Sequence, residues 1–234
     1  MCGALGLLVG GVTGPLPAQA RTMIEIAHTN SERLMRLIND ILDMEKIEAG
    51  KLHFDLQPLH LMALVEQALE VNRAYAEQFG VSFALAQIVP GARVCADGDR
   101  LIQVLTNLLS NAAKFSPRGE TVEVAVARHA GCIRLEVRDH GPGIPEAFRG
   151  RIFQKFAQAD SSAASQKGGT GLGLNITKAI VQRLGGQIGF ESAIGVGTTF
   201  YVDLPELDPS LPIAPAGIAT DARLTGLPEP GTLS

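Results

Sequence analysis

The segment QKGGTGLGLN, residues 166–175, constrains this chain more than any other stretch of its sequence. It places four glycines in six positions and then turns directly into an apolar helical pattern. Glycine weakens helix and strand interiors, so this density indicates that something approaches the bare backbone closely. The segment matches neither common phosphate-binding loop, because it lacks a G-x-x-x-x-G-K-[ST] or G-x-G-x-x-G pattern and no strand leads into it. Taken alone, it also fits a flexible loop.

Composition indicates a globular protein and excludes several function classes. The 234 residues are 46% hydrophobic and 19% charged, which is an ordinary globular balance. The net charge is -4 with both signs interspersed, so no basic stripe predicts nucleic-acid binding. Cys2, Cys95 and Cys132 are odd in number and far apart, without metal-ligand or disulfide spacing. This pattern fits a reducing compartment, and we expect a cytoplasmic location.

Residues 1–50 predict a helical hairpin. Between Pro17 and Glu48 the chain has no Gly or Pro and carries apolar residues at helical spacing, until Gly50 ends the pattern. A helix of this length cannot bury its apolar stripe alone. With the short apolar segment before it and the turn GGVTGPLP, it predicts a hairpin that pairs with a second copy into a four-helix bundle, hence a homodimer.

The first twenty residues permit a second interpretation. Their apolar run is followed by Ala18-Gln19-Ala20, which looks like the cleavage site of a secretory signal. No positive residue precedes the run, however, and glycines interrupt it, so the tail of an amphipathic helix is the favoured interpretation. The run is much shorter than the roughly 20 apolar residues that cross a bilayer, so we expect no membrane contact within this chain.

From residue 51 to residue 206 the pattern changes to mixed helix and strand. Strands are predicted at 51–56, 81–86, 92–96, 121–129, 132–140, 187–192 and 198–204, and helices at 61–79, 99–115 and 171–184. The order of these elements predicts an α+β fold, with a two-layer α/β sandwich whose mixed sheet carries helices on one face. Residues 207–234 are rich in Pro, Gly and Ala without any period, and we expect a disordered tail there.

Three further segments bear on chemistry. In NLLSNAAKF, helical spacing places Asn107, Asn111 and Lys114 on one face. Two asparagines on a mostly apolar helix need partners, which are either neighbouring loops or a Mg²⁺ ion beside a lysine that reaches a phosphate.

In DHGPGIP, Gly141 and Gly143 allow a tight turn after a strand that ends at Asp139. A carboxylate accepts a hydrogen bond from an exocyclic amine and not from a carbonyl, so Asp139 would select adenine over guanine. This pattern is weak by itself, because many surface turns look like it. GVGTTF, residues 195–200, is a further glycine turn that opens a strand.

Taken in order, these segments and RIFQKF at 151–156 resemble the N, G1, F, G2 and G3 boxes of sensor histidine kinases. The ATP-binding domain of that family has the Bergerat-type fold shared with gyrase-type and mismatch-repair ATPases. The resemblance covers residues 17–205 and implies ATP and Mg²⁺ as cofactors. It also implies a phosphoacceptor helix and a response regulator as partners.

The resemblance also assigns roles to residues. Asn111 would ligate Mg²⁺ with support from Asn107, Lys114 would contact phosphate, and Asp139 would bond the adenine amine. Residues 157–167 would form a mobile lid over ATP, hinged by the glycines at 168, 169, 171 and 173. The full expected binding set is Asn107, Asn111, Lys114, Asp139, Gly141, Gly143, Ile144, Gly169, Thr170, Gly171, Leu172 and Gly173.

Asn107 discriminates within the superfamily. Hydrolysing members place a Glu at this position, one helical turn before the Mg²⁺-ligating Asn, where it activates water. An amide cannot serve as that base. The sequence therefore favours phosphoryl transfer to another acceptor over an ATPase.

The family's phosphoacceptor motif, H-[ED]-x-x-x-P on the first helix of the hairpin, is missing. None of the five histidines is followed by an acidic residue, and His28, on the second helix, precedes Thr29. A solvated or packed imidazole is the expected state of His28. We therefore expect the chain to begin just after the motif and to contain no catalytic phosphoacceptor. The leading hypothesis is a histidine-kinase catalytic module, and the alternative is a non-catalytic nucleotide-binding regulator that acts on a partner kinase through its hairpin.

Overall fold

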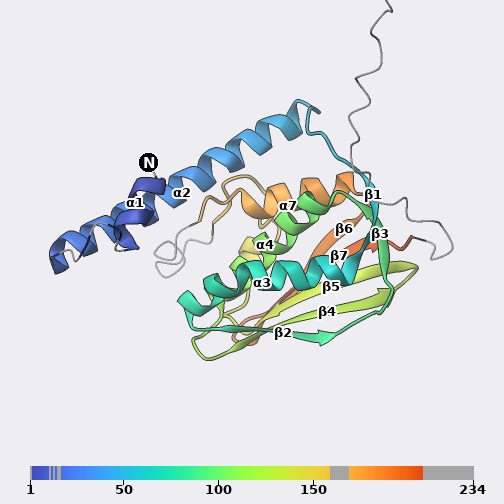
Figure 1. Ribbon diagram of the computed structural model, residues 1–234. Helices are drawn as coiled ribbons and strands as arrows, with labels where there is room; N and C mark the ends of the chain where they lie inside the picture. Colours follow the sequence, from blue (N-terminus) through green and yellow to red (C-terminus); the bar gives the residue numbers. More distant parts are fainter. Residues whose placement is uncertain (1, 11, 13, 15–16, 159–168, 208–234) are drawn as a thin grey trace, which may run out of the picture.

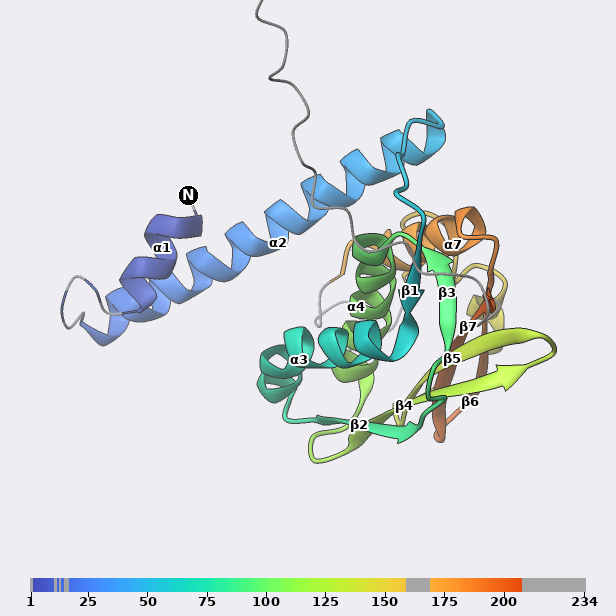
Figure 2. The same cartoon turned by 45° about the vertical axis from the view of Figure 1, so that its right-hand side comes forward.

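The computed structural model describes residues 2–10, 12, 14, 17–158 and 169–207. A long helix extends from one side of a layered body of helices and strands (Figures 1 and 2). The segments 159–168 and 208–234 lie outside the described residues, and with them most of the expected lid at 157–167 and nearly all of the expected tail at 207–234.

The N-terminal region is helical, as predicted. Helix α1 (Cys2–Val9) lies against the first half of α2 (Ala18–Glu48), which reaches from the tip of the molecule to the layered body (Figure 2). After α2 the chain turns at Gly50, whose φ of 64° suits glycine. His28 is half-buried on α2, and its Nε2 lies 3.4 Å from the place that a Cβ on Gly6 would occupy. This packing agrees with the expectation that His28 is a solvated or packed imidazole.

The sheet is mixed, as the sequence predicts. Its strand order is β2-β4-β5-β7-β6, with β2 parallel to β4 and every other pair antiparallel. Its strands are β2 (Ser82–Gln87), β4 (Thr121–His129), β5 (Cys132–Asp139), β6 (Gln187–Ala193) and β7 (Gly197–Pro205). Along β4 the side chains of Val122, Val124 and Val126 are buried and alternate with more exposed residues, as expected for a sheet with one covered face.

Three helices cover that buried face: α3 (Leu61–Phe79), α4 (Gly98–Phe115) and α7 (Gly173–Arg183) (Figure 1). Helix α4 is central, since it packs against both α3 and α7 and buries seven apolar residues. A short helix that the sequence analysis did not predict, α5 (Glu146–Arg149), follows the turn after β5. Within the described residues, no helix is both long enough and apolar enough to cross a membrane.

One strand prediction and the predicted number of sheets need correction. Residues 51–56 form no strand; the strand in this region is β1 (Gln57–His60). It pairs antiparallel with β3 (Arg93–Ala96) in a separate two-stranded sheet, so the expectation of a single sheet is also wrong. The alternating pattern of residues 51–56 has no partner strand, whereas Leu59 lies opposite Val94 in the ladder. Pro58 is tolerated because an edge strand does not need all of its N–H groups.

Candidate functional site

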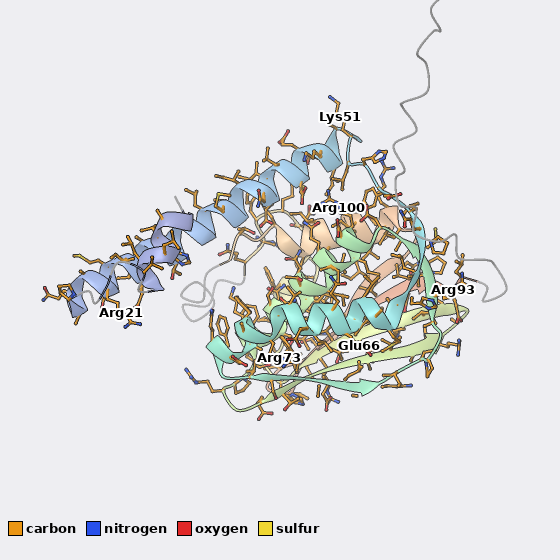
Figure 3. The ribbon with its side chains drawn as sticks, viewed as in Figure 1. Arg21, Lys51, Glu66, Arg73, Arg93 and Arg100 are labelled. Atoms are coloured by element: carbon orange, nitrogen blue, oxygen red, sulfur yellow. The ribbon has the colours of Figure 1, made fainter. Side chains whose placement is uncertain are left out.

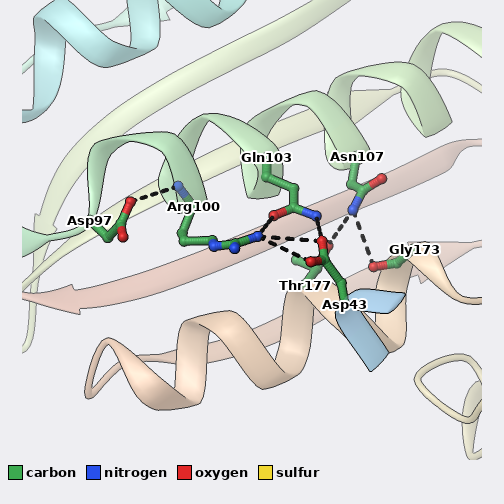
Figure 4. A network of polar contacts seen from close by, with 7 residues as sticks. All are labelled: Asp43, Asp97, Arg100, Gln103, Asn107, Gly173 and Thr177. Atoms are coloured by element: carbon green, nitrogen blue, oxygen red, sulfur yellow. Dashed lines mark hydrogen bonds and ion pairs between the residues drawn. The ribbon is translucent and has the colours of Figure 1, made fainter. Parts of the chain in front are cut away.

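Helix α4 turns its polar face toward α7 and the glycine segment. Asp97 caps the start of α4 by accepting a hydrogen bond from the Arg100 N–H at 3.1 Å. The apolar face of α4, which lies opposite the polar face, is buried in the core through Leu105 and Leu108. The polar residues on the other side are therefore held in a fixed direction, as Figure 4 shows for Asn107.

Asn107 joins α4 to the start of α7. Its Nδ2 donates to the Gly173 carbonyl and to Thr177 Oγ1, both at 3.3 Å (Figure 4). A Cβ on Gly173 would lie 3.1 Å from Asn107 Oδ1, so α7 approaches this amide closely. The structure thus brings together two sequence motifs that are 66 residues apart.

Lys114 reaches the glycine segment itself. Its Nζ lies 3.1 Å from the place that a Cβ on Gly169 would occupy, and 4.8 Å from the centroid of the Phe115 ring. Asn111 is half-buried one helical turn after Asn107, and in the described part of the chain its amide makes no hydrogen bond. The Lys114 ammonium group therefore lies beside bare backbone, and Asn111 lies on the same face of α4.

The glycine segment has a conformation that requires glycine. Gly171 has φ of 71°, and a Cβ there would lie 2.8 Å from the backbone of Phe156. Leu172, which is 1% exposed, anchors the segment in the core. The Thr170 hydroxyl accepts from the Leu172 N–H at 3.2 Å, and α7 begins without a side-chain cap. The first N–H groups of a helix have no intrahelical partner, so this end favours an anion.

Asp139 is a buried carboxylate at the end of β5, with 6% exposure. Its Oδ1 accepts from the Gly141 N–H at 2.8 Å and from the Thr198 N–H at 3.3 Å. Burial raises the pKa of Asp139, and these two hydrogen bonds oppose the rise only in part. Oδ2 has no hydrogen bond to any described residue, so one acceptor atom remains available for a ligand amine.

The turn after Asp139 lies against the end of α4. A Cβ on Gly141 would lie 2.9 Å from the Phe115 carbonyl oxygen. Gly143, with φ of 75°, sits so close to the Ala193 carbonyl that no side chain fits. The Ile144 N–H donates to Ser192 Oγ at 2.8 Å, which fastens the turn to the β6–β7 hairpin. The predicted binding residues on α4, in this turn and in the glycine segment therefore border one region.

Two family models match this chain. Residues 96–208 match the histidine kinase-, DNA gyrase B- and HSP90-like ATPase family, and residues 2–50 match the His Kinase A (phospho-acceptor) domain. The chain is 42% identical over 206 residues to the circadian input-output histidine kinase CikA of Synechococcus elongatus, covering 86% of this chain and 27% of the relative. It is 35% identical over 199 residues to the signal transduction histidine-protein kinase BarA of Escherichia coli, covering 82% and 22%.

Solved structures of histidine kinases are also similar to this chain. Full-length ShkA in complex with AMPPNP superposes with a TM-score of 0.70 at 30% identity, covering 88% of this chain and 42% of that one. The mycobacterial sensor histidine kinase MprB gives a TM-score of 0.56 at 29% identity, covering 65% of this chain and 98% of that one.

The chain belongs to the sensor histidine kinases. It has the ATPase domain and the dimerisation helices of that family, and it spans about a quarter of the length of the curated relatives that it matches.

Sequence reasoning missed several residues that support the site of this histidine kinase. Thr198 donates its N–H to Asp139, Ser192 holds Ile144, and Thr177 accepts from Asn107. Thr198 lies within GVGTTF, so a glycine turn next to a hydroxyl residue was a usable signal. Ser192 and Thr177 have no such signal, because only the folded chain brings them near their partners.

Proposed function

We propose that this chain is the ATP-binding catalytic module of a two-component sensor histidine kinase, which transfers the ATP γ-phosphate to a histidine outside this chain. The observation that carries the proposal is the contact between the polar face of α4 and the glycine segment, where Lys114 reaches Gly169 and Asn107 bonds to Gly173. In this proposal residues 1–50 form the dimerisation hairpin, residues 51–206 the ATP-binding domain and residues 207–234 a tail.

Each part of the site has a role in holding the nucleotide. Asp139 accepts a hydrogen bond from the adenine amine, and Gly141, Gly143 and Ile144 shape the turn beside the base. Lys114 and the backbone of the glycine segment hold the phosphates, with the start of α7 adding a favourable field. Asn107 holds α7 in register with α4. Phosphoryl transfer depends mainly on such positioning.

Mg²⁺ fits a site with Asn111 as its protein ligand. Magnesium in kinases is commonly held by one or two side-chain oxygens together with the substrate phosphates and water. The described residues contain no group of three or more His, Cys, Asp or Glu that could enclose a metal, which is compatible with that arrangement. The ion would neutralise charge on the triphosphate, and Lys114 would share that task. We place the module in the cytoplasm, where its ATP is found.

We further propose that α2 pairs with a second copy. Its apolar side chains are exposed in the single chain: Met23, Ile26, Leu34, Met35, Ile38, Ile41 and Leu42. Burial of such a stripe against another helix is the usual way in which bundles are stabilised. The phosphoacceptor helix of the kinase and a response regulator are the other partners that this function requires.

The proposal is tested with γ-labelled ATP and Mg²⁺. The chain alone should bind ATP without labelling itself on histidine, because none of its histidines is followed by an acidic residue. A supplied polypeptide carrying the H-E-x-x-x-P helix should become labelled, with label that survives alkali and is lost in acid. Binding without any transfer would favour the non-catalytic regulator instead.

His28→Ala is the control for self-labelling. His28 lies on α2, packed near Gly6 and followed by Thr29, so it lacks the adjacent carboxylate that takes the acceptor proton. Alkali-stable label on the isolated wild-type chain that disappears in His28→Ala would overturn the assignment of the acceptor to another polypeptide.

A further inference from the structure

The second half of α2 presents acidic side chains to the ATP-binding domain. Asp40 accepts a hydrogen bond from Thr170, Asp43 bonds to α4, and Glu48 forms an ion pair with Lys155. Met44 lies on the same side of α2 and is 8% exposed. This half of α2 is therefore docked, in contrast to the apolar stripe that it leaves exposed.

One of these contacts occupies a residue of the proposed phosphate site. The Thr170 hydroxyl donates to Asp40 Oδ2 at 2.8 Å and accepts from the Leu172 N–H at 3.2 Å. A hydroxyl has a single proton, so Thr170 cannot donate to Asp40 and to a phosphate oxygen at once. A carboxylate at hydrogen-bond distance from this segment also repels a triphosphate.

A second contact anchors α2 to the helix that carries the N box. Asp43 accepts from Arg100 Nη1 at 3.3 Å and from Gln103 Nε2 at 2.8 Å (Figure 4). The side chains of Arg100 and Asp43 are 24% and 16% exposed, so solvent screens this pair less than a surface pair. Arg100, Gln103 and Asn107 are spaced three and four residues apart, which places them on one face of α4. The anchor and the nucleotide residues therefore share that face.

We propose that docked α2 is an internal competitor of the nucleotide triphosphate, in which Asp40 withholds Thr170 and Asp43 fixes the docked position. This inference rests on the proposed function of the glycine segment as a phosphate site. The apparent affinity for a triphosphate is the intrinsic affinity multiplied by the fraction of molecules in which α2 is undocked. By linkage, nucleotide binding weakens the docking of α2 to the same degree. ATP occupancy is thereby coupled to release of the helix that reaches the dimer interface.

The test measures binding of Mg²⁺-AMPPNP by calorimetry to the full chain and its variants. Asp43→Arg places like charges opposite Arg100 and should tighten binding about tenfold, or about 1.4 kcal/mol. The charge-swapped double variant Asp43→Arg, Arg100→Asp should return toward wild-type affinity. Glu25→Arg is the matched control, because Glu25 is an exposed residue of the same helix whose partner is Arg21, and it should leave affinity unchanged.

Asp40→Ala tests the competing contact directly and should also tighten binding of Mg²⁺-AMPPNP. Adenosine, which has no phosphate, should bind equally to wild type and to Asp40→Ala. Weaker AMPPNP binding in this variant would mean that Asp40 helps to hold the nucleotide, and would overturn the inference. An equal gain for adenosine and AMPPNP would also overturn it, because competition at Thr170 concerns phosphate alone.

These outcomes separate the two proposals. If wild type and all variants bind AMPPNP with the same affinity, the competitor is refuted and the proposed function stands. If neither wild type nor any variant binds AMPPNP, the phosphate site itself is wrong and the competitor falls with it.

Discussion

Helices α2 and α4 are both amphipathic, but they differ in how far their apolar sides are buried within the chain. In α4 the apolar side is closed off by the sheet and by α3, so that Leu105 and Leu108 are at most 1% exposed. In α2, Leu34 is 56% exposed and Met23 is 72% exposed. Helical periodicity is thus the same signal in both, and what differs is whether the covering surface belongs to the same chain.

The contrast also runs within α2. Its second half has partners inside the chain, since Met44 is buried and Asp43 bonds to Arg100. Its first half lies beside α1, away from the layered body (Figure 2). We infer a self-sufficient ATP-binding domain and a hairpin that depends on a second copy.

A pair of leucine-to-alanine substitutions tests the difference in burial between α4 and α2 most directly. Leu108→Ala should lower the free energy of unfolding by about 2–5 kcal/mol, because it leaves a cavity in a closed core. Leu34→Ala, the matched control on α2, should cost less than about 1 kcal/mol at concentrations where the chain is monomeric. Urea denaturation followed by circular dichroism measures both. Similar costs for the two would show that α2 and α4 are equally buried.

The next largest effect concerns ligand binding. Asp139→Asn should weaken ATP binding by about 1.5–3 kcal/mol, because a charge-assisted hydrogen bond to the adenine amine is lost and the amide can turn its donor toward that amine. Calorimetric titration measures the loss. Thr29→Ser on α2, a change at an exposed residue outside the proposed binding set, is the control and should bind like wild type. Wild-type affinity in Asp139→Asn would refute the adenine assignment.

The same variant should be more stable than wild type near neutral pH. Burial raises the pKa of Asp139 in the folded state above its ordinary value of 3.8, so the folded protein disfavours the charged form. Protonation of Asp139 therefore contributes to the free energy of unfolding. This contribution is complete below the pKa that Asp139 has in the unfolded chain, and it is lost as the pH rises through the pKa of Asp139 in the folded protein. Asp139→Asn removes that loss. Comparison of thermal unfolding between pH 3 and pH 7 checks this, and a parallel pH dependence in both proteins would contradict it.

A smaller effect is expected from glycine geometry. Gly171→Ala should destabilise the domain by about 1–2 kcal/mol, because its φ of 71° disfavours any Cβ and the Phe156 backbone leaves no room. Gly150→Ala is the matched control, with ordinary φ and nothing within 4 Å of a new Cβ. Thermal denaturation should separate the two variants, and a neutral Gly171→Ala would mean that the segment can relax.

Sequence periodicity located most elements of this fold. The helix at 61–79 and the strand at 121–129 have the bounds that the sequence predicts, because each ends at a strong local signal such as Gly80. The predicted strand at 51–56 was wrong, since pairing with the distant segment Arg93–Ala96 decides where this short edge strand forms. The local sequence pattern does not indicate which distant segment will pair with the strand.

The site divides in the same way. Glycine and asparagine are unfavourable inside helices, so Asn107 and Gly171 could be singled out from the sequence. Asp139 could be singled out because it ends a strand directly before a glycine turn. Asp43 and Arg100 could not, because they are ordinary charged residues on helices and meet only across 57 positions. Their contact is a property of how the hairpin docks, which no local pattern encodes.

The smallest effect on stability should be the most informative about α2. Ile38→Ser should change the free energy of unfolding of the monomer by less than about 0.5 kcal/mol, because this side chain is already 43% exposed. It should nevertheless weaken self-association, since Ile38 belongs to the exposed apolar stripe that a second copy would cover. Thr29→Ser, about 180° around the helix from Ile38, is the control. Sedimentation over a range of concentrations should show a dimer for wild type and the control, with dissociation shifted to higher concentration in Ile38→Ser. Equal association in all three would mean that the apolar face of α2 is not what joins two copies, and the hairpin would then need a different partner.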